Sequence, residues 1–498
     1  MACLTEFRIS WLLHFHYQTT LGYSTLIISE VSGAGLSSMT IQRATTSQLA
    51  VRNGGGIAST MPEKAVKPWK LPPQKTYLFQ NANVVDAASG SIIANMAVKI
   101  SGGLIEYIGQ DVVASPDDVV VDLDGKYICP GLIDCHVHIK AVPGDDGLYG
   151  SAFGTDAAVS HFRQPYLCGQ MLAKGFTTIR DTGGATLALK EAIEDDVFPG
   201  PRMFIANQAL SQTGGHGDRR GAHDHQQCCG NQGGLSIVVD GVPECIRGAR
   251  EQLRTGADFI KIMVGGGVAS PTDRIENTQF TAAEIRAICE VAESYGTFVT
   301  AHAYTPKAIR HAVDHGVRGI EHGNLLDHDT ALYLQHRGVW LTPTLVTYAA
   351  MGSDKYAGFL PPANLEKNRR MLDRGLDALR IASEAGLPIC HGSDLLGPLQ
   401  AEQSREFGIR ARVLSGKAVL QGATVNAAKM LRQETFLGSI KEGFAADMLI
   451  LNANPLDDVS ILDEPERWVL AVVKNGRVYK SRWSRLPEDV REERELIE

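Results

Sequence analysis

Between about residues 129 and 435, short apolar runs of strand length alternate with segments whose apolar residues recur at helical spacing. One helix is well marked, because Thr281 and Glu284 form a capping-box pattern ahead of Ile285, Ile288 and Ala292 on one face. The predicted strands are GLIDCHVHI, FTTIRD, RMFIANQAL, FIKIMV, FVTAHAY, GIEHG, VWLTPTLV and LPICHGSD. Strands that alternate with helices are typical of a parallel sheet, and eight such units predict an α/β fold, a (β/α)8 TIM barrel over 129–435.

The segments on either side of this region have the pattern of short β-strands. Residues 71–128 contain YLFQNANVVD, SIIANMAVKISGGLIEYIGQ and VVVDLDGKYICP, and residues 436–480 contain GSIKEGFAADMLILNANPLDD and WVLAVVKNGRVYK. The Asn475-Gly476 pair between two apolar runs predicts a tight hairpin turn. The two segments, although far apart in sequence, could therefore complete one small sheet.

The ends of the chain carry less information. Residues 1–70 lack sustained periodicity and contain Ser, Thr and Gly runs, so we expect a poorly ordered tail; residues 481–498 form a charged tail. The short apolar patch at 11–13 is interrupted by His14 before it reaches the length of a signal peptide. No run reaches the ~18 apolar residues that a membrane span needs. We expect a cytoplasmic protein, with secretion as the alternative and no membrane partner.

Composition and charge narrow the function classes. The 498 residues include 48 Lys and Arg against 56 Asp and Glu, a net charge of -8, which leaves no basic footprint for nucleic acid. Hydrophobic residues make up 44% and charged residues 21%, ordinary values for a globular protein. The nine cysteines, an odd number, do not indicate a disulfide framework.

Potential metal ligands fall at or near the C-terminal ends of the predicted strands. They are His136, His138, Lys261, His302, His322 and Asp394. His136 and His138 form a His-x-His on an extended segment, so both imidazoles point to the same side and can hold one ion. In a TIM barrel the strand C-termini meet at the face where active sites lie. Several nitrogen and oxygen ligands that converge there suit Zn²⁺ or a similar divalent ion.

Lys261 lies in the run Phe259-Ile260-Lys261-Ile262-Met263, which is otherwise apolar. Burial would lower the pKa of its ammonium and favour the neutral amine, which can react with CO₂. The resulting carbamate could bridge two metal ions. The alternative is that Lys261 extends to solvent or pairs with a carboxylate.

Taken together, GLIDCHVHI, GFTTIRDTGG, ALSQTGGHGD, GADFIKIMVGGGVASPTD, TAHAYTPKAIRHAV, GIEHGNLLD, PTLVTY and HGSDLLG resemble the amidohydrolase superfamily. More narrowly, they resemble its imidazolonepropionase-like branch, which includes Xaa-Pro dipeptidases and ochratoxinase-type carboxypeptidases. The resemblance covers about residues 76 to 480. It implies that the terminal β segments form one small β-sandwich domain. It also implies a binuclear ligand set: the first ion on His136, His138 and Asp394, the second on His302 and His322, and carboxylated Lys261 as the bridge.

The mechanism that these ligands imply begins with water activation, since metal coordination lowers the pKa of water from 15.7 toward ~7. Asp394 is the candidate general base, which would take a proton from the nucleophile and pass it to the departing nitrogen. Tyr304 lies two residues after His302 on the same side of an extended strand and could donate a hydrogen bond to the developing oxyanion. The alternative for Tyr304 is an aromatic residue at the barrel rim.

The GGHGD segment at 214–218 follows the third predicted strand and resembles a loop of the same family. His216 is a candidate for holding the substrate, with Arg219 or Arg220 as a partner for a free α-carboxylate. Loop arginines are otherwise usually solvated. The His and Cys residues at 223–229 could suggest another zinc site, but Cys228-Cys229 lacks the usual ligand spacing and a glycine-rich lid is the preferred interpretation.

These observations predict a binuclear metal-dependent amidohydrolase that cleaves a dipeptide or an N-acyl amino acid. Its cofactors are expected to be two divalent ions, with Zn²⁺ preferred, and CO₂ for the carboxylation of Lys261. The alternatives are a cyclic-amide hydrolase or a deaminase of the same superfamily, because those share the barrel and ligands. A non-catalytic scaffold is disfavoured, since every ligand position is filled. We further expect a homo-oligomer.

Overall fold

The computed structural model describes residues 16–19, 22–25, 62–151, 156–224 and 234–490. The chain divides into two units, 1–68 and 69–498. In the first unit, β1 (His16–Thr19) pairs with β2 (Gly22–Thr25) in antiparallel fashion, and α1 spans Glu63–Val66. Most of the predicted N-terminal tail, the end of the predicted C-terminal tail and most of the predicted lid lie outside the described residues.

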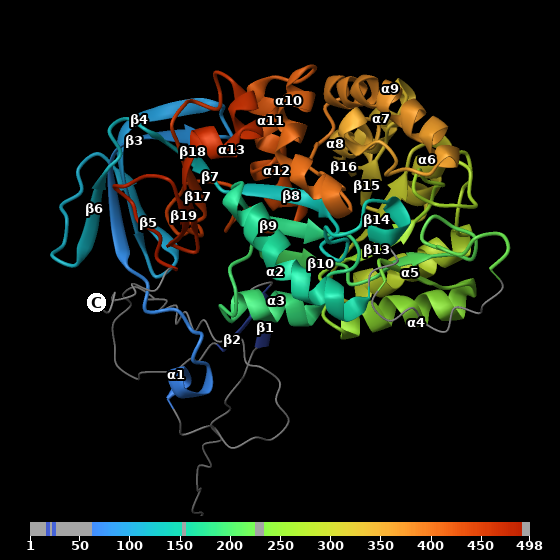
Figure 1. Cartoon of the computed structure of the whole chain (residues 1–498), viewed down its shortest axis with the longest axis horizontal. Helices are drawn as coiled ribbons and strands as arrows, with labels where there is room; N and C mark the ends of the chain where they lie inside the picture. Colours follow the sequence, from blue (N-terminus) through green and yellow to red (C-terminus); the bar gives the residue numbers. More distant parts are fainter. Residues whose placement is uncertain (1–15, 20–21, 26–61, 152–155, 225–233, 491–498) are drawn as a thin grey trace, which may run out of the picture. The chain divides into compact units, whose positions relative to one another are not determined.

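The second unit contains the predicted barrel (Figure 1), whose strands run parallel to one another. The first sheet has the order β10-β9-β8 and the second the order β12-β11-β13-β14-β15-β16. Their bounds are β8 (Leu132–Val137), β9 (Phe176–Asp181), β10 (Arg202–Ile205), β11 (Ala209–Ser211), β12 (Ser236–Val238), β13 (Ile260–Met263), β14 (Val299–Ala303), β15 (Gly319–His322) and β16 (Trp340–Thr342). The barrel prediction is confirmed, with two differences in its strands.

The third predicted strand is divided and the eighth is not a regular strand. Asn207, with a left-handed φ of 56°, separates β10 from β11. The predicted strand at 387–394 makes isolated backbone bonds to both neighbours instead. On one side the Cys390 amide donates to the Leu341 carbonyl at 2.8 Å and the Leu341 amide to the Pro388 carbonyl at 3.1 Å. On the other side the Cys135 amide donates to the His391 carbonyl and the Asp394 amide to the His136 carbonyl, both at 2.8 Å. Because these bonds reach β16 on one side and β8 on the other, the segment still closes the barrel.

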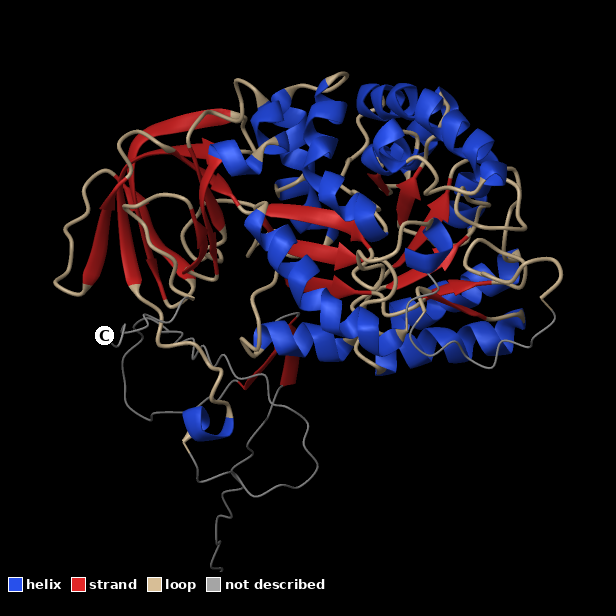
Figure 2. Ribbon diagram, viewed as in Figure 1, coloured by secondary structure: helices blue, strands red, loops and turns tan. Residues whose placement is uncertain are grey.

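Helices enclose the barrel strands (Figure 2). The capping box of α5 is present, and the predicted stripe of Ile285, Ile288 and Ala292 is buried against the barrel core. The helices that follow barrel strands are α2 (Ala157–Ala173), α3 (Leu187–Glu194), α4 (Gly241–Arg254), α5 (Ala282–Ser294), α6 (Pro306–Asp314), α7 (His328–His336), α8 (Leu345–Met351) and α9 (Pro362–Glu384). The remaining helices of this unit are α10 (Glu406–Ala411), α11 (Gly416–Gly422), α12 (Val425–Met430), α13 (Pro465–Trp468) and the 3₁₀ segments η2 (Asp354–Tyr356), η3 (Gly397–Arg405) and η4 (Val459–Asp463).

The two ends of the second unit form one sheet of eight strands, as predicted. Its order is β19-β18-β17-β7-β3-β4-β5, with β6 also paired to β3. The bounds are β3 (Thr76–Asp86), β4 (Ser91–Ser101), β5 (Leu104–Gly109), β6 (Asp118–Asp122), β7 (Tyr127–Pro130), β17 (Met448–Leu451), β18 (Val469–Lys474) and β19 (Arg477–Ser481). All eight strands contribute to one buried apolar cluster, so this sheet has a hydrophobic core of its own. Asn475 and Gly476 both have positive φ, which confirms the predicted hairpin turn.

Within the described residues, no helix combines the length and apolar character needed to cross a membrane. The six cysteines in this part of the chain are all free thiols, five of them buried.

Candidate metal centre and active site

The predicted ligands converge at the C-terminal ends of the barrel strands. His136, His322 and Asp394 place one ligand atom each within 4.8 Å of one another. The Asp394 Oδ1 atom lies 3.4 Å from Nε2 of His136 and 3.2 Å from Nε2 of His138. His302 packs edge-on against His322, with ring centroids 4.6 Å apart. The structure therefore brings together residues that are up to 258 positions apart in the chain, as the spacing from His136 to Asp394 shows.

Each of three histidines has its Nδ1 atom engaged by the protein. The partner of His136 is Glu321 Oε2 at 2.8 Å, that of His138 is the Gly183 carbonyl at 2.8 Å, and that of His322 is Thr344 Oγ1 at 2.7 Å. Such bonds fix the tautomer and the ring orientation of metal-ligating histidines. They leave the Nε2 atoms available to an ion, so the donor set fits a divalent metal.

His302 is oriented differently from the other three. Its Nε2 atom lies 3.2 Å from the Gly266 carbonyl oxygen, an acceptor that requires a proton on this nitrogen. The Nδ1 atom of His302 is therefore the one left to bind an ion. Burial lowers the pKa values of His302 and His322 well below the ordinary range, which keeps both rings neutral and able to coordinate.

The backbone at two ligands departs from ordinary strand geometry. His322 has a φ of 73° and Asp394 a φ of 53°, both in the left-handed region that non-glycine residues rarely adopt. Successive side chains along a regular strand point to opposite sides, so in a regular strand His322 and Glu321 would face opposite ways. The left-handed turn lets both side chains reach the metal centre. Backbone of this kind is found where tertiary contacts impose it, most often at functional sites.

Lys261 lies on β13 with 1% of its surface exposed. Burial lowers the pKa of its ammonium to about 8, with a smaller contribution from the Arg180 charge, while Glu321 and Asp394 oppose the shift. A substantial fraction of the amine is therefore neutral near pH 8. This is the state that the predicted reaction with CO₂ requires.

Asp394 and Tyr304 are the predicted catalytic pair. Burial raises the pKa of Asp394, but its interaction and hydrogen bond with His136, together with the hydrogen bond from His138, outweigh burial, so the pKa lies well below the usual range. Tyr304 is 3% exposed and packs edge-on to His302, with centroids 4.7 Å apart. Its hydroxyl accepts a hydrogen bond from Tyr348 at 2.9 Å, so its own hydrogen is left to be donated elsewhere.

A cavity opens over these residues. Its lining contains predicted ligands, His216, Tyr304 and a set of apolar side chains; in full it consists of His138, His216, Gly217, Leu235, Ser236, Met263, Val268, Ala269, His302, Tyr304, Thr347, Tyr348, Met351, Asp394 and Leu396. The ring of His216 stacks on that of His302, with centroids 4.1 Å apart. Arg219 and Arg220 do not line this cavity, and Arg220 forms an ion pair with Asp218 at 2.6 Å.

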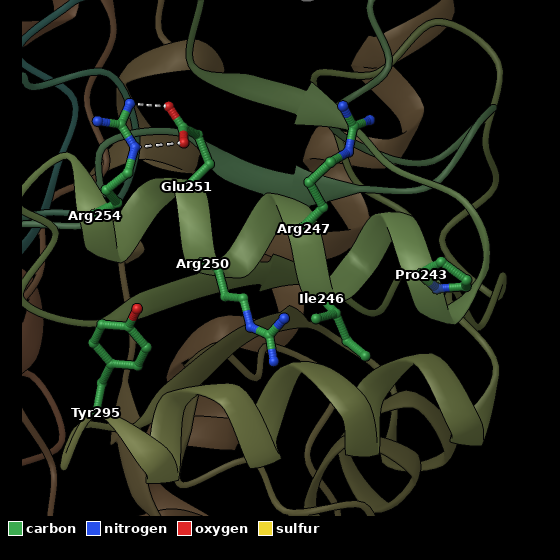
Figure 3. A pocket seen from close by; sticks show the side chains of 7 residues that line it. All are labelled: Pro243, Ile246, Arg247, Arg250, Glu251, Arg254 and Tyr295. Carbon is green, nitrogen blue, oxygen red and sulfur yellow. Dashed lines mark hydrogen bonds and ion pairs between the residues drawn. The ribbon is translucent and has the colours of Figure 1, made fainter.

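A second cavity lies on the outer side of the barrel, between α4 and the end of α5 (Figure 3). It is lined by Arg247, Arg250, Arg254, Glu251 and Tyr295 with two apolar residues, and Arg254 pairs with Glu251 at 2.6 Å. It holds none of the predicted ligands. The candidate active site is therefore the cavity at the barrel mouth.

The sequence analysis missed the residues that support the ligands. Glu321 Oε1 pairs with Arg180 at 2.6 Å, and both side chains are at most 1% exposed. Burial raises the pKa of Glu321, but the Arg180 charge and the His136 hydrogen bond hold it well below its usual range. The sequence signal for Glu321 and Arg180 was a charged residue inside the predicted strands GIEHG and FTTIRD, because barrel strands are otherwise apolar. Thr344 and Tyr348 carried no such signal.

Comparison with known proteins agrees with this geometry. The model of the amidohydrolase family matches residues 127–479. The ochratoxinase of Aspergillus niger is 29% identical over 428 residues, which cover 80% of this chain and 86% of the relative. A prolidase structure solved with N-methylphosphonate-L-proline superposes with a TM-score of 0.79 at 40% identity and covers 82% of this chain and all of its own. A Xaa-Pro dipeptidase structure with bound methionine has a TM-score of 0.74 at 29% identity, covering 82% of this chain and 100% of that one.

Proposed function

Because this chain belongs to the amidohydrolase family, we propose that it hydrolyses the amide bond of a dipeptide or an N-acyl amino acid. The observation that carries the proposal is the convergence of ligand atoms of His136, His322 and Asp394 within 4.8 Å, with Asp394 also lining the cavity at the barrel mouth. The proposal is further supported by the relatives, which include an ochratoxinase, a prolidase and a Xaa-Pro dipeptidase.

The proposed cofactors are two divalent ions, with Zn²⁺ preferred. His136, His138 and Asp394 would hold the first, His302 and His322 the second, and carboxylated Lys261 would link them. When bound, the ions would supply Lewis-acid activation of water and of the amide carbonyl. The engaged Nδ1 atoms of His136 and His138 support this assignment, because the Nε2 atom of each ring then faces Asp394 Oδ1, at 3.4 Å and 3.2 Å.

Two side chains of this chain are proposed to act on the reacting atoms. Asp394 is ionised at neutral pH and would accept a proton from the attacking water and return it to the departing nitrogen. Tyr304 would donate its hydroxyl hydrogen to the oxygen of the tetrahedral intermediate, since burial raises the pKa of Tyr304 and keeps it protonated. The bond that breaks is the carbonyl carbon–nitrogen bond.

The cavity lining supports a substrate with an apolar group beside the scissile bond. Leu235, Met263, Val268, Met351 and Leu396 surround the polar end of the cavity. His216 is proposed to contact the substrate directly. Arg219 does not line the cavity. It remains a proposed partner for a free carboxylate of the substrate, which it would contact from its loop.

The test is an assay of free amino acid release by metal-loaded protein on a panel of dipeptides and N-acyl amino acids. We expect turnover that a chelator abolishes and that added Zn²⁺ restores. Ring opening of cyclic amides or release of ammonia, with no release of amino acids, would instead favour the alternative functions within the family. The variant Asp394→Asn serves as the inactive reference.

A further inference from the structure

The protonation pattern of His216 can be worked out from the groups around it. The Nδ1 atom of His216 lies 2.8 Å from Oγ of Ser270. The Ser270 hydroxyl also contacts two other groups, the carboxylate of Asp273 and the carbonyl oxygen of Gly267, the latter at 3.2 Å. Both of these groups are acceptors only, because an ionised carboxylate and a carbonyl have no hydrogen to give.

Ser270 has one hydrogen, which must therefore go to Asp273 or to Gly267. In either case the Ser270 oxygen can only accept from His216, so the proton of a neutral His216 ring is on Nδ1. The Nε2 atom then carries a lone pair. Within the part of the chain that the structure describes, the hydrogen bond of the His216 ring is made through Nδ1, to Ser270.

The surroundings hold Asp273 and the His216 ring in place. Asp273 Oδ2 accepts from the Gly267 amide at 3.1 Å and from Gln279 Nε2 at 2.9 Å, while Lys367 Nζ lies 3.5 Å from Oδ1. Gln279 also accepts from the His216 amide at 2.9 Å. A Cβ at Gly267 would lie 2.0 Å from the His216 ring, so only glycine lets the ring lie here.

The cavity into which His216 projects suits a donor rather than an anion. Its described lining contains no lysine or arginine, and Asp394 is among its members. An imidazole nitrogen with a bare lone pair repels a carboxylate oxygen but accepts a hydrogen from nitrogen.

We propose that Nε2 of His216 accepts a hydrogen bond from a nitrogen-bound hydrogen of the substrate, and that Ser270 and Asp273 are positioning residues that fix the required tautomer. The donor is the α-ammonium group of a dipeptide or the N–H of the scissile amide. This inference rests on the proposed function, and it narrows the expected role of His216 from contacting the substrate in general to accepting a hydrogen from it.

The first experiment reads the tautomer without any activity. Two-dimensional ¹⁵N–¹H spectra of the full-length, metal-loaded chain with labelled histidine rings distinguish protons on Nδ1 from protons on Nε2, and His216→Gln identifies the resonance. We expect the Nδ1–H form in the wild type and a mixture of tautomers in Ser270→Ala. Observation of the Nε2–H form in the wild type would overturn the inference. Ser160→Ala is the matched control, because the buried Ser160 hydroxyl donates to the Lys140 carbonyl at 2.8 Å outside the cavity lining.

The second experiment identifies the donor with four substrates. Alanyl-leucine has both donors, propionyl-leucine only the amide N–H, alanyl-proline only the α-ammonium, and propionyl-proline neither. For His216→Leu we expect kcat/KM to fall roughly 10- to 100-fold for the substrates that have the relevant donor, the range for a hydrogen bond that involves a charged group. Propionyl-proline should change by less than about 3-fold, because its hydrolysis makes no such bond.

The outcomes separate the two proposals. If the wild type hydrolyses none of the four substrates, the proposed function is contradicted, while the tautomer spectrum still decides the role of Ser270 and Asp273. If the wild type is active and His216→Leu lowers all four rates equally, only the present inference is contradicted. A larger loss for alanyl-proline than for propionyl-leucine would identify the α-ammonium as the donor, and the reverse would identify the amide N–H.

Discussion

The Nδ1 atom of His136 lies 2.8 Å from the Oε2 atom of Glu321, a carboxylate that is fully buried at the centre of the barrel. Glu321 directly precedes the predicted ligand His322, so one short segment of β15 both supplies a ligand and orients another. Its charge is balanced by Arg180 at 2.6 Å. This buried pair links the metal centre to the stability of the barrel.

Replacement of Glu321 should weaken metal binding. In Glu321→Gln the amide keeps the shape but loses the charge that supports the His136 proton, so we expect metal affinity to fall by about 10- to 100-fold. Competition with a chromophoric chelator measures this. The control is Glu284→Gln, which removes a helix-capping carboxylate far from the site. Unchanged affinity in Glu321→Gln would show that this carboxylate does not orient the ligand.

The ion pair between Arg180 and Glu321 should also contribute to the free energy of unfolding. Arg180→Ala leaves the Glu321 carboxylate buried without its cation, so we expect the free energy of unfolding in urea to fall by about 3–5 kcal/mol. Arg254→Ala is a matched comparison, since its ion pair with Glu251 has the same 2.6 Å length but lies at the surface (Figure 3). Solvent screens that pair, and we expect no measurable change. Equal losses of unfolding free energy in the two variants would contradict the expectation that burial makes the Arg180–Glu321 pair the more stabilising one.

Lys261→Ala should lose both activity and bound metal, because no carbamate can form. Metal analysis should find fewer than two ions per chain, and small carboxylic acids such as formate should restore part of the activity by filling the vacated position. Lys174→Ala is the control, as burial lowers the pKa of Lys174 to about 8 as well, but its ammonium donates to the Gln400 carbonyl at 2.9 Å. Full activity with two ions in Lys261→Ala would refute the bridging role.

Tyr304→Phe should lower kcat by about 100-fold while KM changes little, because an oxyanion donor acts in the transition state. Steady-state kinetics on the best substrate of the panel provide the measurement. Tyr77→Phe is the control: this tyrosine is equally buried, and its hydroxyl donates to Asp489 at 2.7 Å in the terminal sheet. A rise in KM with kcat unchanged would instead indicate that Tyr304 contributes only to substrate binding.

Lys474 should make stability depend on pH in the alkaline range. Burial lowers its pKa from 10.5 to about 8, and its ammonium donates to the Gly200 carbonyl at 2.6 Å. Between these two pH values the unfolded chain holds a proton that the folded chain has released, so stability rises with pH by up to about 1.4 kcal/mol per pH unit. The unfolding free energy of the wild type and of Lys474→Met can be measured by denaturation from roughly pH 7.5 to 10.5. Its slope against pH should be smaller in the variant.

Local sequence was sufficient for the elements and for the choice of candidate ligands. The alternation of strands and helices predicted the barrel, and Asn475-Gly476 predicted the hairpin of the terminal sheet, because periodicity and turn chemistry act over a few residues. The eighth strand was predicted as regular and is instead held by isolated backbone bonds. Pairing with both neighbours depends on how the barrel closes, which a local pattern does not contain.

The sequence by itself determined which residues reach the C-terminal ends of the strands, since strand direction and side-chain alternation follow from the chain. Only the tertiary structure decided which nitrogen of each histidine is available. That choice depends on partners distant in sequence, such as Glu321 for His136 and Ser270 for His216. It depends also on the left-handed backbone at His322 and Asp394, which surrounding contacts impose against local preference. The positions of the candidate ligands are thus a local property of this chain, whereas the orientation of their side chains is a property of the packed barrel.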